Sequence, residues 1–199
     1  MSALHVFDMD GTLLRDTSAG HEISRRMGTM DELAELEARW AAHEITEPQF
    51  AAGIRAMWGE LTHDVVAAVV ADAPWIAGID RVCAGIAARG ETSMLITMSP
   101  DFVAQHVLTF GVAHVRASAF PDLPFARDID PAGILTPADK VRLVDEPRLT
   151  HLSRCVNLGA ACPRPPTSIP RRGPTPSATR GCSGCWSPRC RSWPGAWWR

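Results

Sequence analysis

The sequence lacks the features that mark membrane and exported proteins. No stretch approaches the roughly 18 consecutive apolar residues that a membrane-spanning helix needs. The N-terminus begins Met-Ser-Ala-Leu-His-Val-Phe-Asp, without the basic segment and apolar core of a signal peptide. Residues 1–146 contain a single cysteine, Cys83, which suits a reducing compartment. We therefore expect a cytoplasmic protein with no membrane partner.

Acidic residues are absent from the C-terminal quarter of the chain. All 22 Asp and Glu lie within residues 1–146, whereas residues 147–199 hold nine of the 20 Lys and Arg. The formal net charge of -2 therefore hides an acidic body and a basic end. Aliphatic residues are also scarce there, because Ile169 is the one Leu, Ile, Val, Met or Phe among the last 40 residues. A segment with so little apolar area cannot offset its ordering entropy, so we predict that residues 160–199 form a disordered tail.

The composition of this tail suggests two kinds of binding site, and the sequence favours neither. Four Trp among many Arg resemble a nucleic-acid-binding arm, but Arg without Lys, among Pro and Ser, is better explained by codon bias. Cys182, Cys185 and Cys190 lack the second Cys or His pair of a closed zinc site. We therefore expect no nucleic-acid partner.

What the chain does contain is an alternation of short apolar strands with helices. Strands are predicted at 4–7, 94–97, 112–117 and 155–158. A helix is predicted after the second strand, with Ser99 as its N-cap and Pro100 in its first turn. Strands that alternate with helices predict an α/β fold with a parallel sheet and right-handed crossovers.

The region between the first two strands is helical almost throughout. Thr46-Glu47-Pro48-Gln49 has the pattern of a capping box, and Thr62 is placed to cap a further helix. No strand pattern interrupts residues 17–89. We therefore predict a helical cap at 17–89, which includes the helix leading back to the core, inserted into an α/β core of residues 1–16 and 90–159.

Two carboxylates follow the first strand directly. Asp8 and Asp10 are separated by one residue, and Gly11 permits a tight turn immediately after them. In open α/β sheets, ligands bind at the carboxyl ends of the strands. A pair of carboxylates there can divide its roles, one as nucleophile and the other as a proton donor and acceptor.

The segment Asp8-Met9-Asp10-Gly11-Thr12-Leu13 resembles motif I of the haloacid dehalogenase (HAD) superfamily. The helical insert behind it resembles the cap of the phosphoserine-phosphatase-like branch. Thr97, at the end of the second strand, matches the second motif of the family, and Lys140, the one lysine of the chain, matches the third. The resemblance covers residues 3–159 and implies a Rossmann-like core.

The chemistry that this resemblance implies is hydrolysis of a phosphomonoester through an aspartyl-phosphate. Asp8 is implied to attack phosphorus, and Asp10 to protonate the leaving alkoxide and then to activate water. Lys140 is implied to supply a positive charge against the nucleophile and the phosphate. Catalysis of this reaction rests mainly on positioning and charge stabilisation.

The resemblance also implies a substrate, a metal and the residues that hold them. The substrate is a small phosphorylated metabolite, and the cofactor is Mg²⁺, held by the Asp8 carboxylate and the Asp10 carbonyl. The residues implied to bind the substrate phosphate are Gly11, Thr12, Thr97 and Met98.

The chain departs from the family at the acidic fourth motif. Ala160 and Ala161 follow the strand at 155–158, and no acid occurs from there to the end. Loss of this ligand predicts a rate lower by a factor of about 10² or more, by analogy with other charge-stabilising groups. Ser18 also stands where phosphoserine phosphatases carry a Glu that reads the substrate amine, so phosphoserine specificity is not supported.

Two alternative functions stay open beside an impaired phosphatase. One is a non-catalytic remnant of the fold that binds phosphate or a protein partner. The other is a haloacid dehalogenase, which is disfavoured because such enzymes lack the second motif-I carboxylate, present here as Asp10. The sequence does not indicate an oligomeric state.

We interpret the abrupt change near residue 160 as the result of a shift of the reading frame or of a sequencing error, either of which gives a C-terminus foreign to the family. Acids and aliphatics vanish together where the fourth motif is due, and Arg, Pro, Ser, Cys and Trp replace them. We predict that one of the other two frames of the gene continues after Leu158 with a Gly-Asp motif. Resequencing the gene and translating both frames tests this, and a continuation without Gly-Asp in either frame counts against it.

Overall fold

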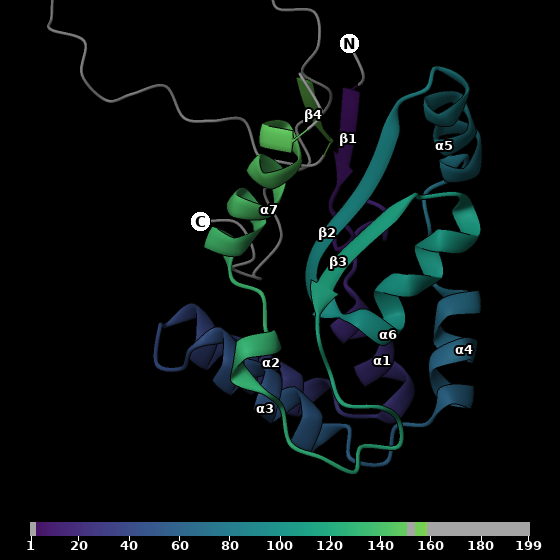
Figure 1. The fold of residues 1–199 in the computed structure, drawn as a ribbon. Helices are drawn as coiled ribbons and strands as arrows, with labels where there is room; N and C mark the ends of the chain where they lie inside the picture. Colours follow the sequence, from purple (N-terminus) through teal and green to yellow (C-terminus); the bar gives the residue numbers. More distant parts are fainter. Residues whose placement is uncertain (1–2, 151–153, 159–199) are drawn as a thin grey trace, which may run out of the picture. The chain divides into compact units, whose positions relative to one another are not determined.

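The protein, seen in a computed structural model, is described over residues 3–150 and 154–158, and this part contains a parallel sheet of four strands (Figure 1). The strands are β1 (Ala3–Phe7), β2 (Thr92–Pro100), β3 (His114–Ser118) and β4 (Arg154–Leu158), in the order β3-β2-β1-β4. Every neighbouring pair is parallel. The predicted α/β class and parallel sheet are confirmed.

Five helices separate β1 from β2 in the chain, as the helical pattern of residues 17–89 predicts. They are α1 (Ala19–Met27), α2 (Met30–Ala41), α3 (Glu47–Met57), α4 (His63–Asp72) and α5 (Ile79–Ala88). The capping box of Thr46 and Gln49 is present at the start of α3. Thr62 caps α4 by accepting a hydrogen bond from the Val65 amide at 3.3 Å. These local signals begin the helices where the sequence places them.

Two groups of apolar side chains cover the two faces of the sheet, and α5 and α7 (Pro137–Thr150) lie on opposite sides of it (Figure 1). The smaller group combines alternate residues of β1 and β2 with Leu143 of α7; its strand members are Leu4, Val6, Met94 and Ile96. The larger group places Phe7 and Leu95 with Cys83 and Ile86 of α5. The alternation along β1 and β2 is what a sheet covered on both faces requires.

The stretch of chain that contains α1 to α4 begins and ends at one place, which we call the crossing. There the chain leaving β1 pairs with the chain leading to α5. The Ile76 amide donates to the Leu13 carbonyl at 2.9 Å, and the Arg15 amide donates to the Pro74 carbonyl at 3.0 Å. The structure groups Met1–Ala160 as one compact unit, so the predicted division into core and cap stays a prediction.

The segment after β2 differs from the expected helix. β2 continues through Ser99 to Pro100, and Pro100 rather than Ser99 is the N-cap of α6 (Asp101–Ala104). The expected helix is divided into this short α6 and a 3-10 helix, η1 (Gln105–Phe110), which ends at Gly111. The prediction of Ser99 as a helix cap is therefore wrong, and its side chain has another partner described below.

An irregular segment containing several Pro connects β3 to α7. It contains one short 3-10 helix, η2 (Pro131–Gly133). The segment is attached to α3, because the Arg55 side chain donates to the Arg127 carbonyl at 3.1 Å and forms an ion pair with Asp128.

The predictions for residues 160–199 lie outside the described residues. Within the described ranges, no helix combines the length and apolar character that crossing a bilayer requires.

Trp58 joins the end of α3 to α1 in the interior. Its indole N–H donates to the Ser24 hydroxyl at 3.0 Å, and both residues are fully buried. We predict that Trp58→Phe lowers the free energy of unfolding by about 1–3 kcal/mol, because it leaves the Ser24 hydroxyl without its donor. Combining it with Ser24→Ala should cost less than the sum of the two single changes, as measured by urea unfolding. Additive costs would contradict the coupling.

Candidate active site

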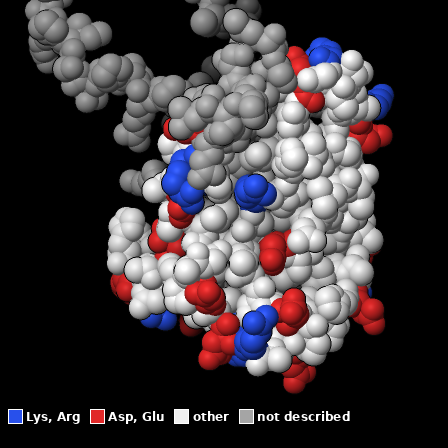
Figure 2. Space-filling model, viewed as in Figure 1, with Lys and Arg blue, Asp and Glu red and all other residues white. Residues whose placement is uncertain are grey.

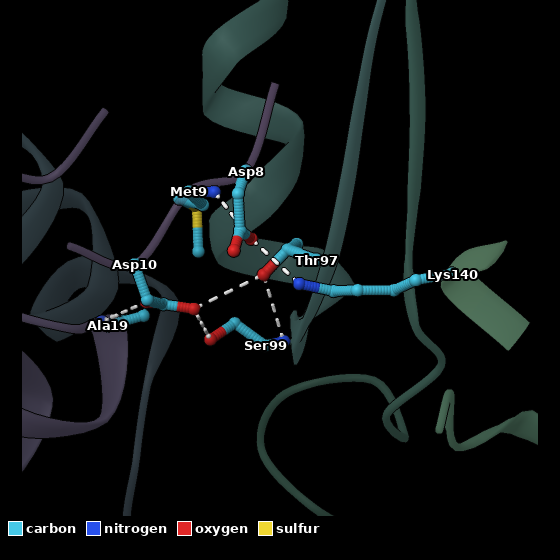
Figure 3. Close-up of polar contacts among 7 residues, drawn as sticks. All are labelled: Asp8, Met9, Asp10, Ala19, Thr97, Ser99 and Lys140. Carbon is cyan, nitrogen blue, oxygen red and sulfur yellow. Dashed lines mark hydrogen bonds and ion pairs between the residues drawn. The ribbon is translucent and has the colours of Figure 1, made fainter. Parts of the chain in front are cut away.

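The site is built where β1 ends, around Asp8. The Asp8 carboxylate accepts hydrogen bonds from the Met9 amide and from the Lys140 ammonium, each at 2.9 Å (Figure 3). Its side chain is 18% exposed, so the carboxylate is accessible from solvent although it is ion-paired. An accessible carboxylate of this kind can act as a nucleophile towards a bound ligand.

Lys140 reaches Asp8 from the first turn of α7, and local hydrogen bonds fix that turn. The Thr136 hydroxyl accepts from the Asp139 amide at 3.3 Å, and the Asp139 carboxylate accepts from the Thr136 amide at 3.0 Å. The Thr136 hydroxyl also donates to the Asp139 carboxylate at 2.7 Å, and this bond, together with the one from the Thr136 amide, lowers the pKa of Asp139. The start of α7 is thereby anchored, which holds Lys140 facing β1.

Asp10 is held by three segments of the chain at once. Its Oδ1 accepts from the Ala19 amide, the first of α1, at 2.8 Å. Its Oδ2 accepts from the Ser99 hydroxyl at 2.7 Å and from the Thr97 hydroxyl at 3.2 Å (Figure 3). Burial raises the pKa of Asp10 and the nearby Asp8 carboxylate adds to the effect, although the three hydrogen bonds act against it. A raised pKa favours the protonated form that a general acid needs.

The turn after Asp10 depends on Gly11. Gly11 has a φ of 68°, which residues with a side chain rarely adopt. Its amide donates to the Thr17 carbonyl at 2.9 Å, and the Thr12 amide donates to the Met9 carbonyl at 3.2 Å. The turn therefore directs the chain from β1 into α1 while both carboxylates stay at the end of the sheet.

The structure brings most of the predicted site residues together. Asp8, Asp10, Thr97 and Lys140 meet at the carboxyl ends of β1 and β2 (Figure 3). Thr97 is fully buried, and its hydroxyl also accepts from the Ser99 amide at 3.1 Å. The implied phosphate contacts of Gly11, Thr12, Thr97 and Met98 stay predictions.

Ser99 is a site residue that the sequence reasoning missed. Its Ser-Pro-Asp context is typical of a helix N-cap, so the sequence indicates that role instead. The hydrogen bond of Ser99 to Asp10 joins residues 89 positions apart and leaves no local pattern. The alternation along β2 was the available signal, because residues 97 and 99 share one side of an extended strand.

The start of α1 uses its polar groups internally. Ser18 caps the helix by accepting from the His21 amide at 3.1 Å. The Glu22 carboxylate accepts from the Thr17 hydroxyl at 2.5 Å and from Arg25 at 2.6 Å. Burial acts to raise the pKa of Glu22, but these hydrogen bonds outweigh it and lower the pKa. The polar side chains of Ser18 and Glu22 are thus engaged in holding α1.

The donor atoms at the site are oxygens, which suits Mg²⁺, but the set is small. Asp8 offers a carboxylate and Asp10 a backbone carbonyl. Among the described residues, no three or more His, Cys, Asp or Glu side chains gather in a way that could hold a metal ion. Mg²⁺ keeps several waters and often uses one or two carboxylates plus a substrate phosphate, so the residues present fit a weakly held ion.

Charged side chains of both signs are mixed on the face that Figure 2 draws, where Lys and Arg lie among Asp and Glu. The expectation that the chain has no nucleic-acid partner stays a prediction.

Comparison with known proteins identifies the family and the fold. The family model described as haloacid dehalogenase-like hydrolase matches residues 5–155. None of the curated proteins matches the sequence.

Solved structures share the fold at low sequence identity. A HAD family hydrolase from Salmonella enterica serovar Typhi has a TM-score of 0.60 and 17% identity, covering 78% of this chain and 55% of that one. This chain thus spans about half of the Salmonella protein. A substrate-bound phosphoserine phosphatase has a TM-score of 0.59 and 14% identity, covering 79% and 78%. A Bordetella pertussis Tohama I protein of unknown function has a TM-score of 0.53 and 24% identity, covering 76% and 77%.

The ionised carboxylate of Asp10 should lower the free energy of unfolding at neutral pH. Because its pKa in the folded protein is raised above the ordinary 3.8, the ionised form is disfavoured by folding. We predict that Asp10→Asn raises the free energy of unfolding at pH values above the raised pKa. The gain should shrink as the pH falls through that pKa and disappear below 3.8, where both states are protonated.

Urea unfolding between pH 3 and pH 8 measures this difference. Asp122→Asn is the matched control, because that side chain is 98% exposed and should show almost no change. A loss of stability in Asp10→Asn at pH 7 would contradict the prediction.

Proposed function

Because this chain belongs to the haloacid dehalogenase-like hydrolases, we propose that it hydrolyses small phosphomonoesters of cytoplasmic metabolites through an aspartyl-phosphate at Asp8. The observation that carries the proposal is the 2.9 Å ion pair between Asp8 and Lys140, which lie 132 positions apart in the chain. Asp10 beside this pair supplies a second carboxylate with a raised pKa. A phosphoserine phosphatase and related hydrolases share the fold, which supports phosphate-ester chemistry.

In the first step, an oxygen of the Asp8 carboxylate forms a bond to phosphorus. The bond between phosphorus and the leaving alkoxide breaks, and protonated Asp10 transfers its proton to that alkoxide. The positive charge of Lys140 compensates for the carboxylate and the phosphoryl oxygens as they approach each other. The products are a free alcohol and phosphorylated Asp8.

In the second step, ionised Asp10 takes a proton from water. The resulting hydroxide forms a bond to phosphorus and displaces the Asp8 carboxylate, which releases inorganic phosphate. Asp10 is protonated again at the end of this step, so the cycle needs no further proton carrier.

When Mg²⁺ is bound, it neutralises charge on the phosphoryl oxygens. The Asp8 carboxylate and the Asp10 carbonyl are the groups of this chain that would hold it. Because the acid of the fourth motif is absent from the sequence, we propose that the activity is lowered by a factor of about 10² or more.

The alternative function is a non-catalytic remnant that binds phosphate or a protein partner. The missing fourth-motif acid favours it, whereas the intact arrangement of Asp8, Asp10 and Lys140 favours the enzyme.

Turnover of p-nitrophenyl phosphate with Mg²⁺ separates the two functions. We expect slow turnover by the natural protein and a loss of at least about 10³-fold in Asp8→Asn, because the amide cannot replace the nucleophile. Beryllofluoride should form an adduct at Asp8 that is detected by fluorine NMR. Equal turnover by both proteins, or no adduct in a folded sample, would favour the remnant.

A further inference from the structure

We propose that Ser99 is a positioning residue that orients the Asp10 carboxyl group for proton transfer to and from the substrate. This inference rests on the proposed function, because it concerns the residue that acts there as acid and base. It is carried by the hydrogen bonds around Asp10 and by the burial of the serine.

Ser99 holds the shortest contact that Asp10 makes. The distance from Ser99 Oγ to Asp10 Oδ2 is 2.7 Å, compared with 3.2 Å for Thr97 Oγ1 and 2.8 Å for the Ala19 amide to Oδ1. Ser99 is 9% exposed, so the hydroxyl is held by the packing at the end of β2.

The two oxygens of Asp10 face different kinds of partner. The Ala19 amide donates to Oδ1 at 2.8 Å, and the Ser99 hydroxyl donates to Oδ2 at 2.7 Å. These two bonds hold the two ends of the carboxyl group and so fix the plane in which it lies.

Thr97 does not duplicate this role. Its hydroxyl already accepts from the Ser99 amide at 3.1 Å and lies farther from Oδ2. Removing the Ser99 hydroxyl should therefore allow the Asp10 carboxyl group to rotate away from the Ala19 amide. Loss of that hydrogen bond can be measured as faster hydrogen exchange of the Ala19 amide.

The test compares Ser99→Ala with Ser93→Ala and Ser99→Thr. Ser93 is a matched control, because it lies on the same strand, is 3% exposed, and accepts from the Ala113 amide at 3.0 Å, away from Asp10. Ser99→Thr restores a hydroxyl. Turnover is measured with an alkyl phosphate and with p-nitrophenyl phosphate, and amide hydrogen exchange is measured at Ala19.

We expect Ser99→Ala to lose about tenfold or more in kcat for the alkyl phosphate, with little change in KM. The loss should be smaller for p-nitrophenyl phosphate, whose leaving group needs less protonation. Exchange at Ala19 should accelerate in Ser99→Ala and not in Ser93→Ala, and Ser99→Thr should restore slow exchange and turnover.

Equal losses for both substrates, or unchanged exchange at Ala19 in Ser99→Ala, would overturn the role of Ser99. If no protein in the series turns over either substrate, the proposed function fails. The exchange rate of Ala19 then still decides whether Ser99 orients Asp10, because that amide has the Asp10 carboxylate as its acceptor.

Discussion

The Asp10 carboxylate is the point at which the separate parts of the site are joined. It accepts hydrogen bonds from the first amide of α1 and from two hydroxyls of β2, so one side chain fixes the start of the helical segment against the neighbouring strand. Burying a carboxylate costs free energy, and the three donors offset only part of that cost, since its pKa stays raised. The arrangement exchanges stability for an acid that can hold a proton.

Lys140 completes the site from α7, a helix that packs against the sheet. Asp8 leaves the end of β1, whereas Lys140 belongs to α7, which packs through Leu143 on Leu4 and Val6 of the same sheet. The ion pair is therefore positioned by the core itself. The comparisons show the family and the fold, and the functional proposal rests on the chemistry of the site.

Much of the fold could be predicted from the sequence because its signals are local. The caps at Thr46 and Thr62 and the apolar runs before Asp8 and Thr97 fixed the order of strands and helices. Asp8 was indicated by its place directly after the first strand, whereas the role of Lys140 followed from the resemblance. Ser99 could not be assigned, because the local preference of Ser-Pro-Asp for a helix start lost to a hydrogen bond with a residue distant in sequence.

The paired crossing of the chain at Leu13–Ile76 and Arg15–Pro74 has an evolutionary consequence. The stretch from α1 to α4 begins and ends at this junction, and it is also attached through the Ala19 amide to Asp10 and through Arg55 to Arg127 and Asp128. Because both ends of this stretch meet at one place, we expect the helices between them to tolerate changes in length or sequence while the strand ends that carry Asp8 and Thr97 keep their positions. Under the proposed function, such changes alter which leaving group is accepted and leave the proposed phosphoryl-binding residues as they are.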